Sequence, residues 1–434
     1  MRRLLLALIA LLFSVQVFGQ NYGNEWIKFN PGQPFSDQQY FKIKTWSNGL
    51  YRITYNDLQS VAFPMPFDPA RLQMYHQGVE QFIHVEDGGD GSFDTTDYVE
   101  FLGKKNDGVF DKQLYRNPDH QPHDRFSLFT DTACYYLTLN ADTSVLNRRM
   151  VLNNDTIDPS YSPIPWFWSE SIFDFRNDYV MRRLAEVKDA EYDEGEGWYS
   201  SPIGNALVFY QMYIPNYSAD PLAPLGRFSA MTMGGNITGL QHSITLEVGG
   251  TSITKNFTGY ETLRFDSTVA SNAISTLPTV NLVLTPGTGV VNRTHLSYLR
   301  LRYPHRTDYT SEYENYRKLT VPGDFDVNGK SFAQITTTYT NLGNPGFFML
   351  SGDTVTRLST NLVGYTVKSM IPTYGSDKNC LIIDSVFTTQ LGRFQLEPVS
   401  NDPQAFARFK NLNDGNGSDY LIVTNDSLIQ SAAD

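Results

Sequence analysis

The chain has 434 residues, of which 41% are hydrophobic, 14% aromatic and 18% charged, and its formal net charge is −12. This length suggests about two to four domains, and the aromatic-rich, charge-poor composition excludes a coiled coil and a disordered chain. Aromatic residues favour strands, so we predict a mainly β fold. The acidic charge, without a stripe of Lys and Arg, argues against nucleic acid as a partner.

Residues 1–19 have the pattern of a secretory signal peptide. The basic pair Arg2-Arg3 precedes an apolar run over 4–12, and the small residue Gly19 suits the end of a cleavable leader. The run is too short to span a membrane comfortably, and no other segment is as apolar. We therefore expect an exported protein, extracellular or on the outer-membrane surface, whose mature chain has no transmembrane span.

Residues 20–145 form the first predicted domain, an N-terminal β-rich unit. Strand patterns cover 41–45, 50–55, 72–76, 81–85, 98–102 and 135–139. The turn residues Asn48-Gly49 and Gln77-Gly78 separate the first four of these strands, which we predict as two hairpins. A short helix is predicted to open at Asn56.

The next regions continue in strands. Residues 146–205 are predicted as a connecting region, in which 179–187 fits either a short helix or a strand. Residues 206–310 alternate apolar and polar side chains on both sides of the turn Gly249-Gly250 and are predicted to form a β-sandwich. Residues 311–410 continue the same strand-like pattern and are predicted as a second β unit.

The last segment, 411–434, has a different character. A polar linker over 411–419 precedes an apolar strand, Tyr420–Thr424, and Asn425 or Asp426 can cap a helix after it. An apolar strand that feeds a helix opens a βαβ unit. One strand and two helical turns cannot bury their own faces, so we expect the start of a truncated α/β domain.

The chain has two cysteines, Cys134 and Cys380, and both lie in strand-like contexts. We favour two buried single thiols, and one disulfide across roughly 245 residues is the alternative in an exported protein.

One acidic segment, 86–97, matches the spacing of a twelve-residue calcium loop. The oxygen ligands would be Glu86, Asp90, Ser92, Asp94 and Asp97, with Gly91 at the sharp turn. A hard cation such as Ca²⁺ prefers six to eight oxygen ligands, which this loop supplies in part. Gly88 at the third position and the short Asp97 at the twelfth count against the site. The alternative is an acidic turn in which Asp and Gly serve turn geometry alone.

Several stretches together resemble the gingipain-type cysteine peptidases of Bacteroidetes. The final segment, Ser418–Thr424 followed by Asp426–Ala433, resembles the first strand and helix of the peptidase domain. Upstream, Asn48–Leu58, Asp90–Gly103 and Glu194–Trp198 resemble the amino-terminal regions of large proteins that carry this domain. The resemblance covers most of the chain in order and spacing.

The resemblance implies a caspase-like α/β catalytic domain downstream and export through the type IX secretion system, with the secretion machinery as a partner. Catalysis in this family uses a Cys nucleophile and a His that is followed by Gly. None of the seven His residues of this chain is followed by Gly, and both cysteines precede the peptidase-like strand. No catalytic residue is therefore assigned here, and we expect this chain alone to be inactive.

The leading hypothesis is thus the non-catalytic amino-terminal region of a secreted cysteine endopeptidase, whose protein or peptide substrates would meet the downstream domain. Two alternatives stay open. One is the type IX sortase, which processes the C-terminal domains of its cargo. The other is a cell-surface adhesion or carbohydrate-binding β-sandwich protein.

Overall fold

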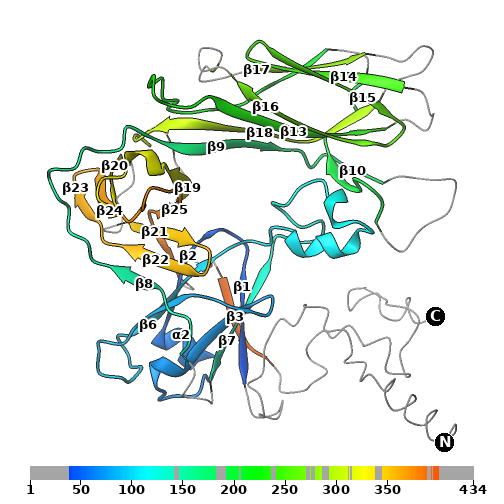
Figure 1. Cartoon of the computed structure of the whole chain (residues 1–434). Coiled ribbons are helices and arrows are strands. Elements are labelled where there is room, and N and C mark those ends of the chain that lie inside the picture. Colours follow the sequence, from blue (N-terminus) through cyan, green and yellow to red (C-terminus); the bar gives the residue numbers. More distant parts are fainter. Residues whose placement is uncertain are drawn as a thin grey trace, which may run out of the picture.

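The computed structural model describes residues 39–140, 146–181, 192–204, 207–235, 241–269, 274, 279–285, 293–310, 312, 315–337, 345–388, 392 and 394–399. Strands dominate these residues, which confirms the predicted mainly β fold (Figure 1). The predicted signal peptide and the predicted peptidase-like segment 411–434 lie outside the described residues. No helix among the residues that the structure describes is long and apolar enough to cross a membrane.

The first unit consists of two facing sheets. One has the order β27 (Phe394–Pro398), β1 (Tyr40–Thr45), β7 (Ala133–Leu139), β3 (Leu72–His76) and β4 (Val79–Glu80); the other has β26 (Val386–Phe387), β2 (Gly49–Thr54), β6 (Tyr98–Gly103) and β5 (Ile83–Glu86). Alternate side chains such as Phe41, Ile43, Tyr51 and Ile53 are fully buried between the sheets. This period of two is the strand pattern seen in the sequence.

Short helical segments connect these strands. The predicted helix is α2 (Tyr55–Ser60), and it begins with a capping box in which Thr54 and Asp57 bond each other's backbone N–H. Leu58 of this helix packs into the core of the first unit. The 3₁₀ segments of the described chain are η1 (Pro69–Arg71), η2 (Val109–Leu114), η3 (Pro118–His120) and η5 (Gly323–Phe325).

The predicted hairpin around Asn48-Gly49 is wrong, because β1 and β2 belong to different sheets. The turn carries the chain from one layer to the other, so that both strands can bury one face in the same core. The second hairpin exists in a shorter form. Strand β4 pairs with β3 only at Glu80 and Val79, and the chain then crosses to the other sheet as β5.

A nine-stranded sheet forms the centre of the rest of the molecule. Its order is β16 (Thr262–Val269), β13 (Gly226–Gly234), β18 (Thr294–Arg306), β9 (Trp166–Asp174), β19 (Tyr316–Val321), β25 (Lys378–Ile383), β21 (Gly346–Ser351), β22 (Thr354–Leu358) and β8 (Val151–Asn153). Two smaller sheets cover its two halves (Figure 1).

The first small sheet has the order β12 (Val208–Gln211), β17 (Thr279–Thr285), β14 (Gln241–Val248) and β15 (Thr251–Thr258). Together with β16, β13, β18 and β9 it encloses a core that includes Phe228, Leu246 and Leu301. This is the predicted β-sandwich. The predicted turn Gly249-Gly250 joins β14 to β15, with positive φ at both glycines, as the hairpin requires.

The second small sheet has the order β20 (Ser331–Thr336), β24 (Thr366–Ile371) and β23 (Asn361–Val363). Its core against β19, β25 and β21 includes Val321, Ile335 and Ile382. A separate ribbon pairs β10 (Asp178–Val180) with β11 (Gly197–Tyr199). The segment predicted over 179–187 therefore begins as a strand; residues 182–191 lie outside the described part.

The structure divides the chain differently from the predicted boundaries. Strand β9, placed in a connecting region at 146–205, is an interior strand of the nine-stranded sheet. Strands β26 and β27, placed in the unit 311–410, complete the two sheets of the first unit instead. Their aromatic residues Phe387 and Phe394 are buried in the core of the first unit. Hydrophobic burial therefore holds this late part of the chain against the first unit.

The first unit packs against one half of the nine-stranded sheet through its second sheet. Leu50 lies in an apolar cluster with Phe348 and Leu381. Beside this cluster the carboxylate of Glu100, 1% exposed, accepts hydrogen bonds from Arg52 (2.6 and 2.9 Å) and from Arg357 of β22 (2.8 Å). A buried carboxylate thus connects the first unit to the nine-stranded sheet.

Candidate functional site: a basic hollow at the division of the large sheet

The predicted calcium loop connects β5 to β6. Glu86 ends β5, and its carboxylate lies 3.4 Å from Nε2 of His84. Asp90 Oδ1 accepts from the Ser92 N–H at 2.9 Å, and Asp97 Oδ2 accepts from the Asp94 N–H at 2.7 Å. These side chains therefore fix the turn itself.

Among the described residues, no group of three His, Cys, Asp or Glu side chains is arranged to hold a metal ion. The glycines Gly88, Gly89 and Gly91 all have positive φ, which turn geometry requires. Phe93 is buried in the first core and anchors the loop. The arrangement is that of an acidic turn, and calcium binding at this loop stays a prediction.

Both cysteines are free thiols. Burial raises the pKa of Cys134 and also the pKa of Cys380, so neither thiol is activated. His76 bonds the backbone oxygen of Cys134 at 2.9 Å, but its ring stacks on Tyr135. Because neighbouring residues of a strand point to opposite faces, the Cys134 sulfur lies on the other side of the sheet from His76. Nothing in this geometry forms a Cys–His pair.

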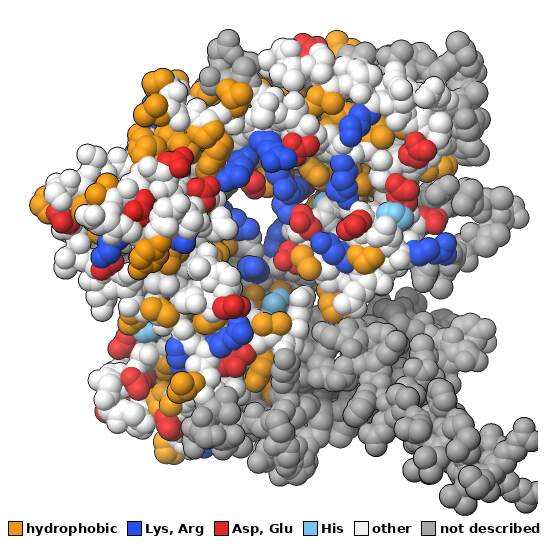
Figure 2. Space-filling view, in the orientation of Figure 1, with side chains coloured by type: hydrophobic (Ala, Val, Ile, Leu, Met, Phe, Trp, Pro, Cys, Tyr) orange, Lys and Arg blue, Asp and Glu red, His pale blue; other side chains and the backbone are white. Residues whose placement is uncertain are grey.

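A large hollow lies where the nine-stranded sheet divides. Strands β9 and β19 are paired only at Trp168 and Thr320, whereas β18 follows β9 along its whole length. Beyond that single pair the two halves of the sheet diverge. The space between them is about 1090 Å³, and Figure 2 shows Lys and Arg side chains gathered around it.

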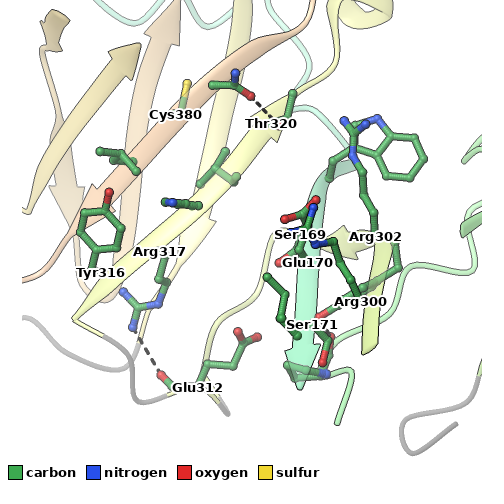
Figure 3. Close-up of a pocket in the computed structure, with 18 of the residues that line it drawn as sticks. Ser169, Glu170, Ser171, Arg300, Arg302, Glu312, Tyr316, Arg317, Thr320 and Cys380 are labelled. Atoms are coloured by element: carbon green, nitrogen blue, oxygen red, sulfur yellow. Dashed lines mark hydrogen bonds between the residues drawn. The ribbon is translucent and has the colours of Figure 1, made fainter. Parts of the chain in front are cut away.

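The lining is more basic than the chain as a whole. Its five basic side chains are Arg125, Arg300, Arg302, Arg317 and Lys318, and its three acidic ones are Asp124, Glu170 and Glu312. The net charge of the chain is −12, so this concentration of positive charge is local. Figure 3 shows that Arg300 and Arg302 come from one wall of the hollow, and Tyr316 and Arg317 from the other.

On the β18 wall, Arg300 and Arg302 are held loosely. The nearest carboxylate to Arg300 is Asp124, at 3.7 Å. The guanidinium of Arg302 lies over the ring of Trp168, 4.6 Å from its centroid. The buried Nε of Arg300 and the buried Nη1 of Arg125 have no hydrogen-bond partner among the described residues.

On the β19 wall, Arg317 forms an ion pair, although its buried Nε has no hydrogen-bond partner among the described residues, and Lys318 forms none. Arg317 is 2% exposed, pairs with Asp384 and donates to the Glu312 backbone oxygen at 3.3 Å. Burial raises the pKa of Asp384, although Arg317 opposes the shift. The Lys318 amine makes no ion pair or hydrogen bond in the described part of the chain. Burial lowers its pKa, and Lys104 adds to the shift.

The charges at the base of the hollow are already compensated. Glu312 Oε1 lies 2.7 Å from Nε2 of the fully buried His305 and accepts from Asn216 at 3.1 Å. Glu170, in contrast, is exposed in the hollow and forms no ion pair within the described residues. The side chains that remain available for a ligand in this site are thus mainly cationic and suit an anion.

This hollow was not predicted from the sequence. The alternation of Arg300 and Arg302 with Leu299, Leu301 and Tyr303 places both arginines on one strand face, which is readable from the sequence. Their position opposite Lys318 depends on the divergence of β9 from β19, which leaves no local signal.

No known protein family matches the sequence, and no curated protein matches it. In three dimensions the chain is similar to dimeric latent PorU from Porphyromonas gingivalis, with 12% identity and a TM-score of 0.49 over 81% of this chain and 32% of that one. It is also similar to a carbohydrate-binding module, CBM36, solved in complex with calcium and xylotriose, with 16% identity and a TM-score of 0.20 over 30% of this chain and 98% of the module. The CBM36-1 domain of a multidomain xylanase from the hindgut metagenome of Trinervitermes trinervoides gives 14% identity and a TM-score of 0.19 over 31% and 95%. The chain spans 32% of the PorU chain.

Proposed function

We propose that this chain is the non-catalytic amino-terminal region of a secreted gingipain-type cysteine endopeptidase, and that its β units hold and position the peptidase domain that follows. The ordered sequence motifs that end in the predicted strand Tyr420–Thr424 support the family. The leader-like residues 1–19 support export.

The observation that carries the positioning role is the return of the chain to the first unit. Strand β27 pairs with β1 from Phe41 opposite Pro398 to Thr45 opposite Phe394. Phe394 is 3% exposed, and Lys44 forms an ion pair with Glu397 at 2.9 Å. The chain therefore leaves the first unit from an anchored strand, and the predicted linker 411–419 and the domain after it follow from that fixed point.

The experiment compares thiol-dependent cleavage of denatured casein by this chain and by the full-length gene product. The full-length product is expected to cleave casein and to lose activity with iodoacetamide, while this chain alone is expected to be inert. Phe394→Ala removes a buried ring, at a cost of about 3–5 kcal/mol, and is expected to lower the yield of active full-length enzyme. The matched control is Phe209→Ala, because Phe209 is 66% exposed.

Thiol-dependent cleavage by this chain alone would contradict the proposal, and so would an inert full-length product. Equal yields from Phe394→Ala and Phe209→Ala would remove the positioning role and leave the peptidase assignment intact.

A further inference from the structure

The basic hollow has the donors for an anionic ligand but holds few anions of its own. Arg300 Nε and Arg125 Nη1 are buried without hydrogen-bond partners among the described residues, and the exposed Lys318 forms no ion pair there. Buried N–H groups without partners are costly, and a bound carboxylate supplies the missing acceptors. Guanidinium groups match the geometry of carboxylates in particular, since two parallel N–H groups can meet two oxygens.

The size of the hollow indicates a ligand larger than a single ion. Its volume, about 1090 Å³, exceeds the usual range of small-molecule pockets, roughly 300–1,000 Å³. Arg300 of β18 and Lys318 of β19 lie on opposite sides of the division, because the sheet divides between β9 and β19. A ligand that reaches both must carry at least two separated negative groups.

The chemistry of the walls favours a peptide over a sugar or a nucleic acid. A sugar ring binds best on a free aromatic face, and the Arg302 guanidinium already covers a face of Trp168. A nucleic acid would meet the repulsion of a chain with net charge −12. An extended acidic peptide spaces its carboxylates along a narrow backbone and can enter between the two halves of the sheet.

We infer that the hollow between β9 and β19 is a binding site for an acidic peptide segment in extended conformation, with Arg300 and Lys318 as its principal anion contacts. The site does not depend on the proposed peptidase domain. Glu170 is the lining carboxylate that opposes such a ligand.

The test is fluorescence anisotropy of the full chain with fluorescein-labelled pentaglutamate. Binding is expected at about 20 mM salt and is expected to weaken strongly at about 300 mM, because salt screens the charges. The double variant Arg300→Gln, Lys318→Gln is expected to raise the dissociation constant about tenfold or more. Glu170→Gln is expected to lower the constant a few-fold by removing a like charge.

Arg227→Gln is the matched control. Arg227 lies on β13 opposite Arg302, on the same face of the sheet, but it is 65% exposed, pairs with Asp266 at 2.8 Å and is outside the lining. This variant is expected to bind like the unaltered chain. If the double variant fails to fold, acetylation of the unaltered chain decides, since bound pentaglutamate is expected to protect Lys318.

Three results would overturn the inference: no saturable binding at low salt, an equal loss with Arg227→Gln, or no protection of Lys318. Binding of oligogalacturonate without binding of pentaglutamate would also overturn it, because the ligand would then be an acidic sugar.

Discussion

The contact between the first unit and the large sheet is expected to depend on the charge of Glu100. Its carboxylate is 1% exposed and faces Arg52 and Arg357, which are 33% and 31% exposed. Glu100→Gln keeps the shape but points an amide at two cations. Removing one partner of a buried ion pair costs about 3–5 kcal/mol, and water can still reach both arginines, so we expect about 2 kcal/mol. For a unit of 150–250 residues this lowers the melting temperature by about 4–8 °C.

The assay is differential scanning calorimetry combined with hydrogen exchange read by mass spectrometry. Glu100→Gln is expected to melt earlier and to exchange faster in β6 and β22. Glu247→Gln is the matched control, because Glu247 also lies on a strand, β14, and its side chain makes no ion pair or hydrogen bond within the described residues. If the two variants melt together and β22 exchanges as before, the charge of Glu100 does not hold the units.

Three further predictions concern pH, backbone geometry and calcium. His123 is 4% exposed, and burial, with Arg125 nearby, lowers its pKa to about 3. The neutral His123 ring contributes fully to stability above the unfolded pKa of about 6.5, and this contribution is lost as the pH falls toward 3. About 2 kcal/mol of unfolding free energy is therefore lost by pH 5. His123→Gln should flatten the fall in melting temperature between pH 7 and pH 5. Gly108 has a φ of +74°, and an added Cβ would overlap the Phe126 carbonyl, whereas Gly91 has a φ of +78° and nothing within 4 Å of an added Cβ. Gly108→Ala should therefore lower the free energy of unfolding in urea clearly more than Gly91→Ala does. Equal losses would refute the overlap. Isothermal titration should detect one calcium ion per chain that Asp94→Asn weakens, and an absence of heat would reduce the loop to a turn.

Local patterns in the sequence predicted the elements that local chemistry determines. The β14–β15 hairpin follows from apolar alternation on both sides of Gly249-Gly250. The short helix expected from Asn56 is α2, although its cap, Thr54, was not identified from the sequence. The mainly β fold follows from the same alternation along the whole chain.

Pairings between distant segments could not be predicted in this way. The turn at Asn48-Gly49 is visible in the sequence, but which sheet receives β2 depends on burial against residues far along the chain. Strand β27 pairs with β1 across about 350 residues, and no local residue type signals that choice. The hollow also depends on a pairing between distant segments. Strands β9 and β19 pair at one position only, Trp168 with Thr320, and diverge beyond it.

The reading frame beyond residue 434 tests the central proposal most directly. A gingipain-type peptidase predicts an α/β pattern over the next few hundred residues, with a His followed by Gly and a later Cys nucleophile. A frame that ends soon after residue 434, or that continues with further β repeats, would contradict the proposal and favour an adhesion or carbohydrate-binding protein.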